Sequence, residues 1–305
     1  NVYAFTSYGG LQILLTANNA VATITSLSIK QVFGNVGTMT NQDSADLVYS
    51  SVLPDQSFLT GVNSAYNFID LDGGDQYIDC GDGTSLDTTS QLTLSSWVNF
   101  DSTGTNVILA RDDNTNSNYI LYGWSDGKIY AQIRISGVGK TVDGGSYSSD
   151  TWYHIVTTFD GSSLKIYVDA DLKDTLSASG SIDNDDVSLE IGRKGNNAFH
   201  FTGKIGQTAI WNKALSSTEV GAIYTLGRHG NLLDSYSDNL VGNWAMSSLD
   251  SATGLSDSIS TIYDRSGNSN HGTPTNADAG DLASSPNAEP NGYSKGDTNR
   301  SNNTP

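Results

Sequence analysis

Several residue types are scarce in this chain of 305 residues, and each scarcity argues against a class of protein. Cysteine occurs once, at Cys80, so the chain can form neither an internal disulfide nor a zinc site made of several thiolates. Glutamate, which helices favour, occurs only three times. Lys and Arg number 15 against 33 Asp and Glu, and the net charge of −18 argues against a nucleic-acid partner, because phosphate binding needs clustered cations.

Long apolar runs are scarce as well. Residues 11–29 form the most apolar long stretch, but Gln12, Asn18 and Asn19 interrupt it, so we expect no insertion into a membrane. We expect no signal peptide within the residues before this stretch. Because the chain begins with Asn1 rather than with Met, we expect that upstream sequence is missing.

Gly, Ser, Thr, Asn and Asp are abundant instead, and these residues favour turns between short strands. Segments with the pattern of strands recur about every ten residues, which indicates a β-sandwich. Asn18-Asn19 and Asp160-Gly161 are predicted to be the turns of hairpins. The strand-like segments are residues 11–17, 20–32, 66–81, 91–100, 106–112, 118–124, 128–135, 152–159, 162–172, 187–193, 204–212 and 240–246. Residues 66–81 are predicted to form two short strands around Asp72-Gly73-Gly74.

One helix is predicted after Ser216, which can form a capping box with Glu219. Its apolar face would consist of Val220, Ile223 and Tyr224. Gly227 is expected to end it.

Three blocks of sequence resemble a concanavalin A-like, laminin G-type domain. They begin with FIDLDGG, WYHIV and FTGKIGQ, span residues 68–100, 152–172 and 201–224, and occur in the order of that family. The resemblance implies an all-β fold, namely an antiparallel jelly-roll β-sandwich with one short helix, to which this chain adds extended polar termini. It also implies that Trp97, Trp152, Trp211 and His154 are structural residues.

One short segment of the sequence is repeated. GTMTNQDSADL at residues 37–47, here called the upstream phrase, returns as GTPTNADAGDL at residues 272–282, the downstream phrase, with seven of eleven positions identical. Residues 240–276 resemble the sequence that leads into laminin G-type units, and residues 34–41 are a shortened form of it. The duplication therefore resembles a module junction. Chance similarity between two edges rich in Thr, Asn and Asp is the alternative.

Four parts of the chain are predicted from these patterns. Residues 1–33 resemble the terminal strands of an incomplete jelly-roll module, and residues 34–230 would form the laminin G-type sandwich. Residues 231–276 would be a junction that leads into a further unit. Residues 277–305 would be a polar extended tail.

Arrays of jelly rolls and laminin G-type units joined in this way resemble bacteriophage tail-fibre, capsid-fibre and related virion proteins. The resemblance implies a non-enzymatic structural protein at the virion surface, a fibre, spike or capsid decoration that adheres to host surface glycans. Its partners would be other virion subunits, with a homo-oligomer, preferably a trimer. Two alternatives stay open: a glycan-binding module of a secreted or cell-surface bacterial adhesin, and a decoration subunit without a ligand.

Catalysis is not expected from the titratable residues. The β-glucanases that share this fold use two glutamates in an E-x-D-x-x-E pattern, with the carboxylates about 5 Å apart. In this chain Glu190 is followed by Ile191-Gly192-Arg193, and no G-x-S-x-G elbow occurs. The four histidines, which are His154, His200, His229 and His271, form no recognisable constellation with a nucleophile.

Binding residues can be predicted from the turns. Sugars dock on exposed aromatic rings and hydrogen-bond to Asn and Asp, and the candidates are Tyr119, Tyr122, Trp124, Tyr147 and Asn118. The alternative is that half or more of these rings belong to the core. Members of the family often bind Ca²⁺ on rim loops, and the candidate ligands are Asp72, Asp75, Asp112 and Asp113. The alternative is that these loops only make turns.

Overall fold

The computed structural model describes residues 2–6, 11–15, 68–113, 115–195, 199–228, 230–246, 261–277 and 281–282. β1 (Val2–Thr6) and β2 (Leu11–Leu15) pair as an antiparallel ribbon within a first compact unit, residues 1–43. Residues 20–32, predicted to pair with residues 11–17, lie outside the described residues, and so does the predicted turn at Asn18-Asn19.

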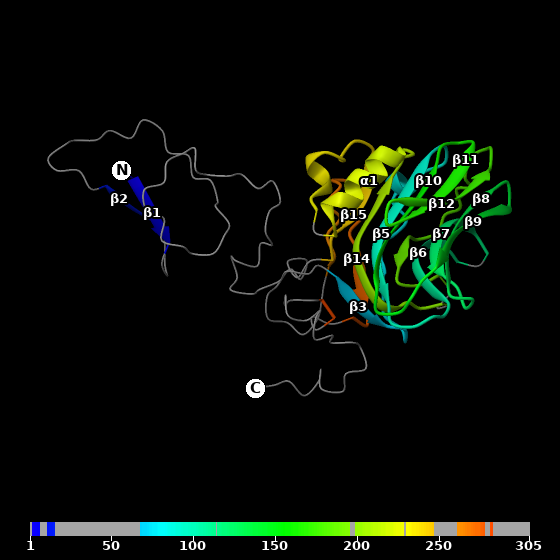
Figure 1. Cartoon of the computed structure of the whole chain (residues 1–305), viewed down its shortest axis with the longest axis horizontal. Coiled ribbons are helices and arrows are strands. Elements are labelled where there is room, and N and C mark those ends of the chain that lie inside the picture. Colours follow the sequence, from blue (N-terminus) through cyan, green and yellow to red (C-terminus); the bar gives the residue numbers. More distant parts are fainter. Residues whose placement is uncertain are drawn as a thin grey trace. The chain divides into compact units, whose positions relative to one another are not determined.

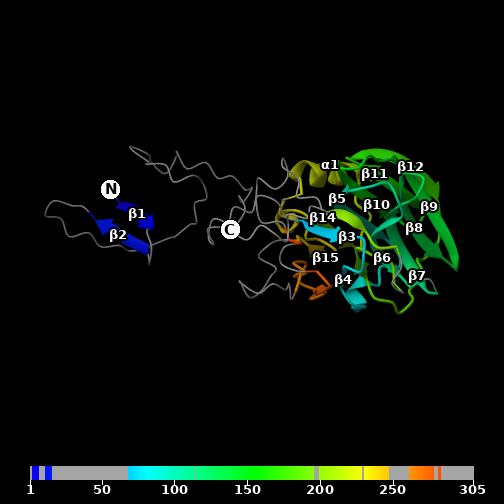
Figure 2. The ribbon, with the colours of Figure 1, turned by 90° about the horizontal axis from the view of Figure 1, so that it is seen from below.

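Two antiparallel sheets of seven strands each form a sandwich in the second unit, residues 44–305 (Figures 1 and 2). The first sheet has the order β12-β11-β10-β5-β14-β15, with β3 also paired to β14, and the second has the order β16-β4-β13-β6-β7-β8-β9. The predicted antiparallel sandwich is confirmed. The strands of the first sheet are β3 Ile69–Asp72, β5 Leu92–Phe100, β10 Trp152–Phe159, β11 Ser163–Val168, β12 Asp171–Ser177, β14 Thr202–Trp211 and β15 Leu240–Trp244. Those of the second are β4 Tyr77–Asp79, β6 Asn106–Asp112, β7 Ser117–Gly123, β8 Lys128–Ile135, β9 Val138–Ser146, β13 Glu190–Ile191 and β16 Thr273–Thr275.

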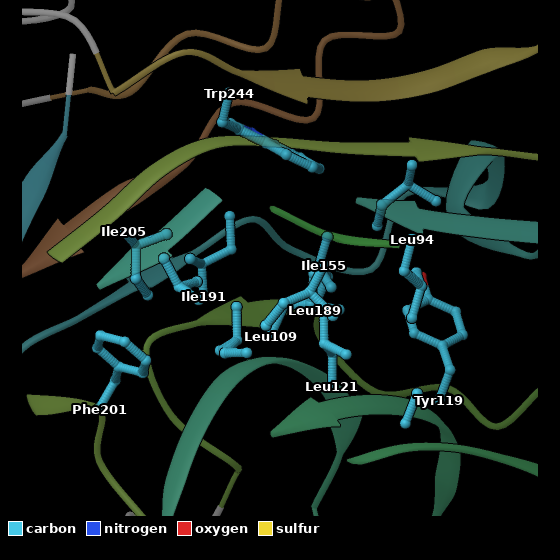
Figure 3. Packing of buried hydrophobic residues seen from close by; sticks show 14 of the residues in the cluster. Leu94, Leu109, Tyr119, Leu121, Ile155, Leu189, Ile191, Phe201, Ile205 and Trp244 are labelled. Carbon is cyan, nitrogen blue, oxygen red and sulfur yellow. The ribbon is translucent and has the colours of Figure 1, made fainter. Parts of the chain in front are cut away.

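The core lies between the two sheets and follows the two-residue period of the strands. Leu92, Leu94 and Val98 of β5 point into it. Ser96, the polar member of this row, is satisfied by a hydrogen bond of 2.9 Å to the hydroxyl of Thr208. Figure 3 shows how residues from both sheets meet in this layer.

The predicted helix is α1 (Ser217–Leu226), and it covers the outer face of the first sheet (Figure 1). Ser216 and Glu219 form the capping box, and Gly227 ends the helix. Val220 and Ile223 are buried against the sheet, which confirms the apolar face at these two positions. Tyr224 is instead exposed and stacks on Trp97, with ring centroids 5.7 Å apart. Two short 3-10 turns, η2 (Thr84–Leu86) and η3 (Leu232–Asp234), complete the helical elements of the described residues.

The two short strands on either side of Asp72-Gly73-Gly74 do not pair with each other. β3 pairs with β14 in the first sheet, whereas β4 pairs with β13 and β16 in the second. Gly73, with a φ of 73°, provides the left-handed backbone at this crossing between the sheets.

The segment that the sequence suggests as a junction is part of the sandwich in this structure. β15 pairs with β14 in the first sheet, and β16 pairs with β4 in the second. The Trp244 ring is fully buried in the core (Figure 3), and its indole N–H donates to the carbonyl of Asn270 at 2.8 Å. Residues 240–282 therefore contribute a strand to each sheet.

Asp264 organises the turn-rich motif between β15 and β16. Its Oδ1 accepts hydrogen bonds from the backbone N–H groups of Asn243 and Ser266, at 2.9 and 2.8 Å. Its Oδ2 accepts from the Ser266 hydroxyl and from the Asn270 N–H, at 2.8 and 3.0 Å. This buried carboxylate with four donors ties residues 264–270 to Asn243 of β15.

Candidate functional site

Four aromatic side chains form a continuous patch on the outer face of the second sheet. Tyr122 of β7 and Tyr130 of β8 are register partners, and their rings stack at 5.6 Å. Trp124 meets the Tyr122 ring edge-on at 5.9 Å and lies 6.1 Å from the Phe199 ring. These four residues, Tyr122, Trp124, Tyr130 and Phe199, are here called the aromatic patch.

The alternation of β7 explains why the patch faces outward. Tyr119 and Leu121 point into the core between the sheets, so Ile120 and Tyr122 point to the opposite face. On that face Tyr122 packs against a small apolar cluster that contains Val107 and Ala110. The patch is therefore anchored to the sheet at Tyr122 and becomes more exposed towards Trp124.

The turn between β7 and β8 holds Trp124 in place. The Trp124 N–H donates to the carbonyl of Lys128 at 2.9 Å, and the Gly127 N–H donates to the carbonyl of Trp124 at 3.0 Å. Gly127 has a φ of 77°, which a residue with a side chain rarely adopts. The backbone of Trp124 is fixed by these bonds, while 40% of the residue is exposed to solvent.

Phe199 comes from a distant loop and shows signs of a constrained position. Its φ of 57° lies in the left-handed region, where bulky residues are outliers. Its carbonyl accepts a hydrogen bond of 3.3 Å from Val107 of β6, yet 44% of the residue is exposed. Strained backbone that displays an apolar ring to water is typical of binding sites.

Polar groups lie beside the patch on β8, on the neighbouring β9 and in the turn between β7 and β8. The Tyr130 hydroxyl donates to Oδ2 of Asp126 at 2.8 Å, and this hydrogen bond raises the pKa of Tyr130 to about 12. Lys128 donates to Oδ2 of Asp143 at 2.6 Å, and this hydrogen bond raises the pKa of the amine. Rings flanked by partly exposed donors and acceptors can bind a molecule with one apolar face and several hydroxyls.

Three of the five predicted glycan-binding residues are buried elsewhere. Tyr119 and Tyr147 are only 1% and 6% exposed, and both belong to the core between the sheets (Figure 3 labels Tyr119). Asn118 exchanges two hydrogen bonds with the backbone of Asp185, at 3.0 and 2.8 Å. None of the three offers a surface to a ligand, so only Tyr122 and Trp124 of the predicted set lie in the patch.

The four predicted calcium ligands lie in two loops and differ in their surroundings. The Asp112 carboxylate is buried, with Lys194 Nζ at 3.1 Å and the Ser117 hydroxyl at 2.7 Å. Asp113 accepts from the backbone of Asn116 and Thr115, and these bonds lower its pKa. Asp72 and Asp75 are exposed. Within the described ranges, no three His, Cys, Asp or Glu side chains are grouped so that they could hold a metal.

His154 has the structural role that the sequence predicts. It is almost fully buried, with Nε2 2.9 Å from the Ser95 hydroxyl and its ring stacked on Trp97 at 4.8 Å. Burial lowers the pKa of His154 to about 3, so the ring is neutral at physiological pH. A Ser–His pair enclosed beneath α1 has no access to a substrate.

The two glutamates in the described part of the chain hold structure together. Glu190 receives two hydrogen bonds from Arg193, at 2.9 and 2.6 Å. Glu219 accepts from Ser216 in the capping box and from Lys213 at 2.6 Å, and the hydrogen bond from Lys213 is the main cause that lowers its pKa to about 2. They lie on β13 and on α1, so they do not form a pair of carboxylates on one strand.

Residues 72–221 match the model of a family described as the concanavalin A-like lectin/glucanases superfamily. This part of the chain has the concanavalin A-like fold. Among solved structures, a candidate carbohydrate-binding protein of Bacteroides ovatus is 20% identical, with a TM-score of 0.50 over 70% of this chain and 58% of that protein. The alignment thus spans less than two thirds of the Bacteroides protein.

Two further solved structures are similar to the concanavalin A-like sandwich. The CBM40 domain of a Ruminococcus gnavus sialidase, bound to α2,3-sialyllactose, is 17% identical, with a TM-score of 0.43 over 52% of this chain and 96% of that domain. A heptameric SAP-like pentraxin from Limulus polyphemus is 16% identical, with a TM-score of 0.43 over 52% and 82%. No curated protein sequence matches the chain. The described residues include no helix with the length and apolarity needed to span a bilayer.

Proposed function

We propose that the concanavalin A-like sandwich is a non-enzymatic glycan-binding module and that the aromatic patch is its binding surface. The observation that carries this proposal is the exposure of Trp124 and Phe199, 40% and 44%, in contact with each other and with the two tyrosines. Scattered single apolar residues on a surface need no explanation, but a contiguous aromatic group marks an interaction site. The Bacteroides ovatus protein with the same fold is described as a carbohydrate-binding candidate, which agrees with this class of function.

The chemistry of the patch suits a sugar. The apolar face of a pyranose ring can stack on Trp124, while its hydroxyls reach Asp126, Lys128 and Asp143 at the rim. Lys128 and Asp143 are already paired with each other, so their bond holds both groups in place for a ligand. This arrangement binds without requiring a reactive group, in accordance with a non-enzymatic role.

We further propose that the module belongs to a bacteriophage virion, as a fibre, spike or capsid-surface decoration at the virion surface. The phrase that occurs in the sequence both before β3 and after β15 supports an architecture of joined modules. Other virion subunits, copies of this chain in a trimer and a host surface glycan would be its partners. A secreted bacterial adhesin is the second candidate, because the same patch would serve it equally.

A glycan array is the first test of the binding function. Wild-type protein is expected to bind a restricted set of glycans, and the Trp124→Ala variant is expected to lose at least about tenfold in affinity, as aromatic anchors at the centre of an interface do. If the wild type binds no glycan, the module is a decoration subunit without a ligand.

We also propose that the module binds Ca²⁺ on a rim loop, through Asp72 and Asp75, the two predicted ligands that are exposed. The array is repeated with chelator. Loss of binding in chelator that the Asp72→Asn, Asp75→Asn variant reproduces would support the ion, and unchanged binding would refute its involvement.

The virion assignment is tested separately. Particles from the source material are sedimented and searched for peptides of this chain by mass spectrometry. Stoichiometric amounts on particles are expected. Peptides found only in the soluble or cell-surface fraction would refute the assignment to a virion and favour the bacterial adhesin.

A further inference from the structure

The downstream phrase contains β16, which pairs with β4. Thr273, Pro274 and Thr275 pair with Asp79, Ile78 and Tyr77. At its far end Leu282 forms an antiparallel bridge with Ile69 and is buried in the core. The surface that receives the phrase, formed by Ile69, Asp70 and residues 76–79, is here called the β4 slot.

Side chains as well as backbone make this docking specific. The Gln76 amide donates to the carbonyl of Asn276 at 3.1 Å and to the Asp281 carboxylate at 3.0 Å. The Asp281 carbonyl accepts from the Asp70 N–H at 2.8 Å. Asn276 has a φ of 55°, a left-handed conformation that asparagine tolerates better than most residues.

Gly272 is required for the strand to fit. A Cβ atom at this position would collide with the Cγ2 atom of Ile78. The Gly272 backbone also exchanges two hydrogen bonds of 2.8 Å with Ile262. A side chain here would push the phrase off the β4 slot.

The upstream phrase keeps the residues on which this docking depends. Gly37, Thr38, Thr40, Asn41, Asp46 and Leu47 stand where the downstream phrase has Gly272, Thr273, Thr275, Asn276, Asp281 and Leu282. Pro274 is replaced by Met39, which adds an N–H that proline lacks, and proline is confined to sheet edges for that reason. The identical positions include most of those that contact the slot, which favours a shared role over chance similarity.

One difference weakens the upstream phrase. Ala277 is buried at the end of β16, and the upstream phrase has Gln42 there, which would bring a longer polar side chain to the core. The downstream phrase is therefore the stronger occupant of the slot, and the upstream phrase can replace it only in competition.

We propose that the β4 slot is an exchangeable docking site and that its second occupant is the upstream phrase, residues 37–47, of another copy of this chain. Each chain has two phrases, whereas its described residues form one β4 slot. Exchange of an equivalent element between copies is a low-cost route to oligomers, because the same contacts form in both arrangements. The slot would thus join subunits by strand addition.

The Gly272→Val variant of the full chain tests this proposal, because it disables the downstream phrase and leaves the upstream phrase intact. Sedimentation equilibrium is expected to show that the variant associates as its concentration rises, whereas the Gly37→Val, Gly272→Val double variant stays monomeric. A monomeric Gly272→Val protein would overturn the proposal. If its thermal stability then fell with Gly37→Val, the occupant would be the same chain and not a second copy.

A peptide-binding measurement tests the proposal a second way and provides for the case that Gly272→Val does not fold. A labelled synthetic peptide of residues 37–47 is expected to bind Gly272→Val, and the same peptide with Gly37→Val at least about tenfold more weakly. If Gly272→Val does not fold, Leu282→Ala replaces it, since that variant loosens only the end of the downstream phrase. The peptide of residues 37–47 is then expected to raise the melting temperature of Leu282→Ala, and the same peptide with Gly37→Val is expected to leave it unchanged. Equal effects of the two peptides would overturn the proposal.

Discussion

Trp244→Ala is the substitution that most directly tests whether residues 240–282 complete the sandwich. The indole is fully buried between the sheets, and its N–H satisfies the carbonyl of Asn270. Truncation of a buried Trp costs about 3–5 kcal/mol, and the unsatisfied carbonyl adds about 1 kcal/mol or more. We expect a loss of about 4–6 kcal/mol in the free energy of unfolding, which corresponds to roughly 10–20 °C in melting temperature for a domain of this size.

Urea denaturation and calorimetry measure this loss, and Tyr263→Ala is the matched control. Tyr263 lies in the same segment, but 38% of it is exposed, so its truncation should cost well under about 1 kcal/mol. Trp244→Phe should fall between the two, because it keeps apolar volume and loses the hydrogen bond. Equal, small effects of Trp244→Ala and Tyr263→Ala would refute the assignment of this segment to the core.

Three further predictions concern the first sheet and its helix. The pKa of His154 in the folded protein is about 3, below its usual value of about 6.5, so the unfolded chain binds a proton first as the pH falls. Up to about 4 kcal/mol of the free energy of unfolding is therefore lost as the pH falls from about 6.5 towards 3. Urea titrations should show a flatter pH profile for His154→Gln than for the wild type, and identical profiles would contradict this. Ser216→Ala removes the capping box and should cost about 1 kcal/mol by urea denaturation, whereas Ser217→Ala should be nearly neutral. Gly203→Ala should lower the melting temperature by several degrees, because Gly203 has a φ of 130° and an added Cβ would collide with the carbonyl oxygen of Asn99. An unchanged melting temperature would show that β5 and β14 can separate there.

The sequence patterns predict most strands and the helix because both have local signals, but they miss β1, β9, β12 and β16. The two-residue period of β5 and the capping box at Ser216 are properties of neighbouring residues. Pairing is not local, and for this reason β3 and β4 are neighbours in the sequence but join opposite sheets. The destination of β15 and β16 depends likewise on contacts with strands far away in the chain.

The candidate site could be predicted only in part, for reasons visible on β7. Both faces of this strand carry apolar residues, so alternation separates Tyr119 from Tyr122 but does not say which of them points to the core. Tyr130 alternates regularly with buried neighbours on β8 and could have been found as the cross-strand partner of Tyr122. Phe199 had no such signal, because it reaches the patch from a loop with a strained backbone.

The central claim is that the aromatic patch binds a glycan, and a titration of the best array ligand tests it most directly. Calorimetry would compare the wild type with Trp124→Ala, Phe199→Ala and Tyr263→Ala, the last being an exposed aromatic outside the patch. We predict that the two patch variants each lose about tenfold or more in affinity while Tyr263→Ala binds as the wild type does. Wild-type affinity in both patch variants, with the fold intact, would contradict the claim.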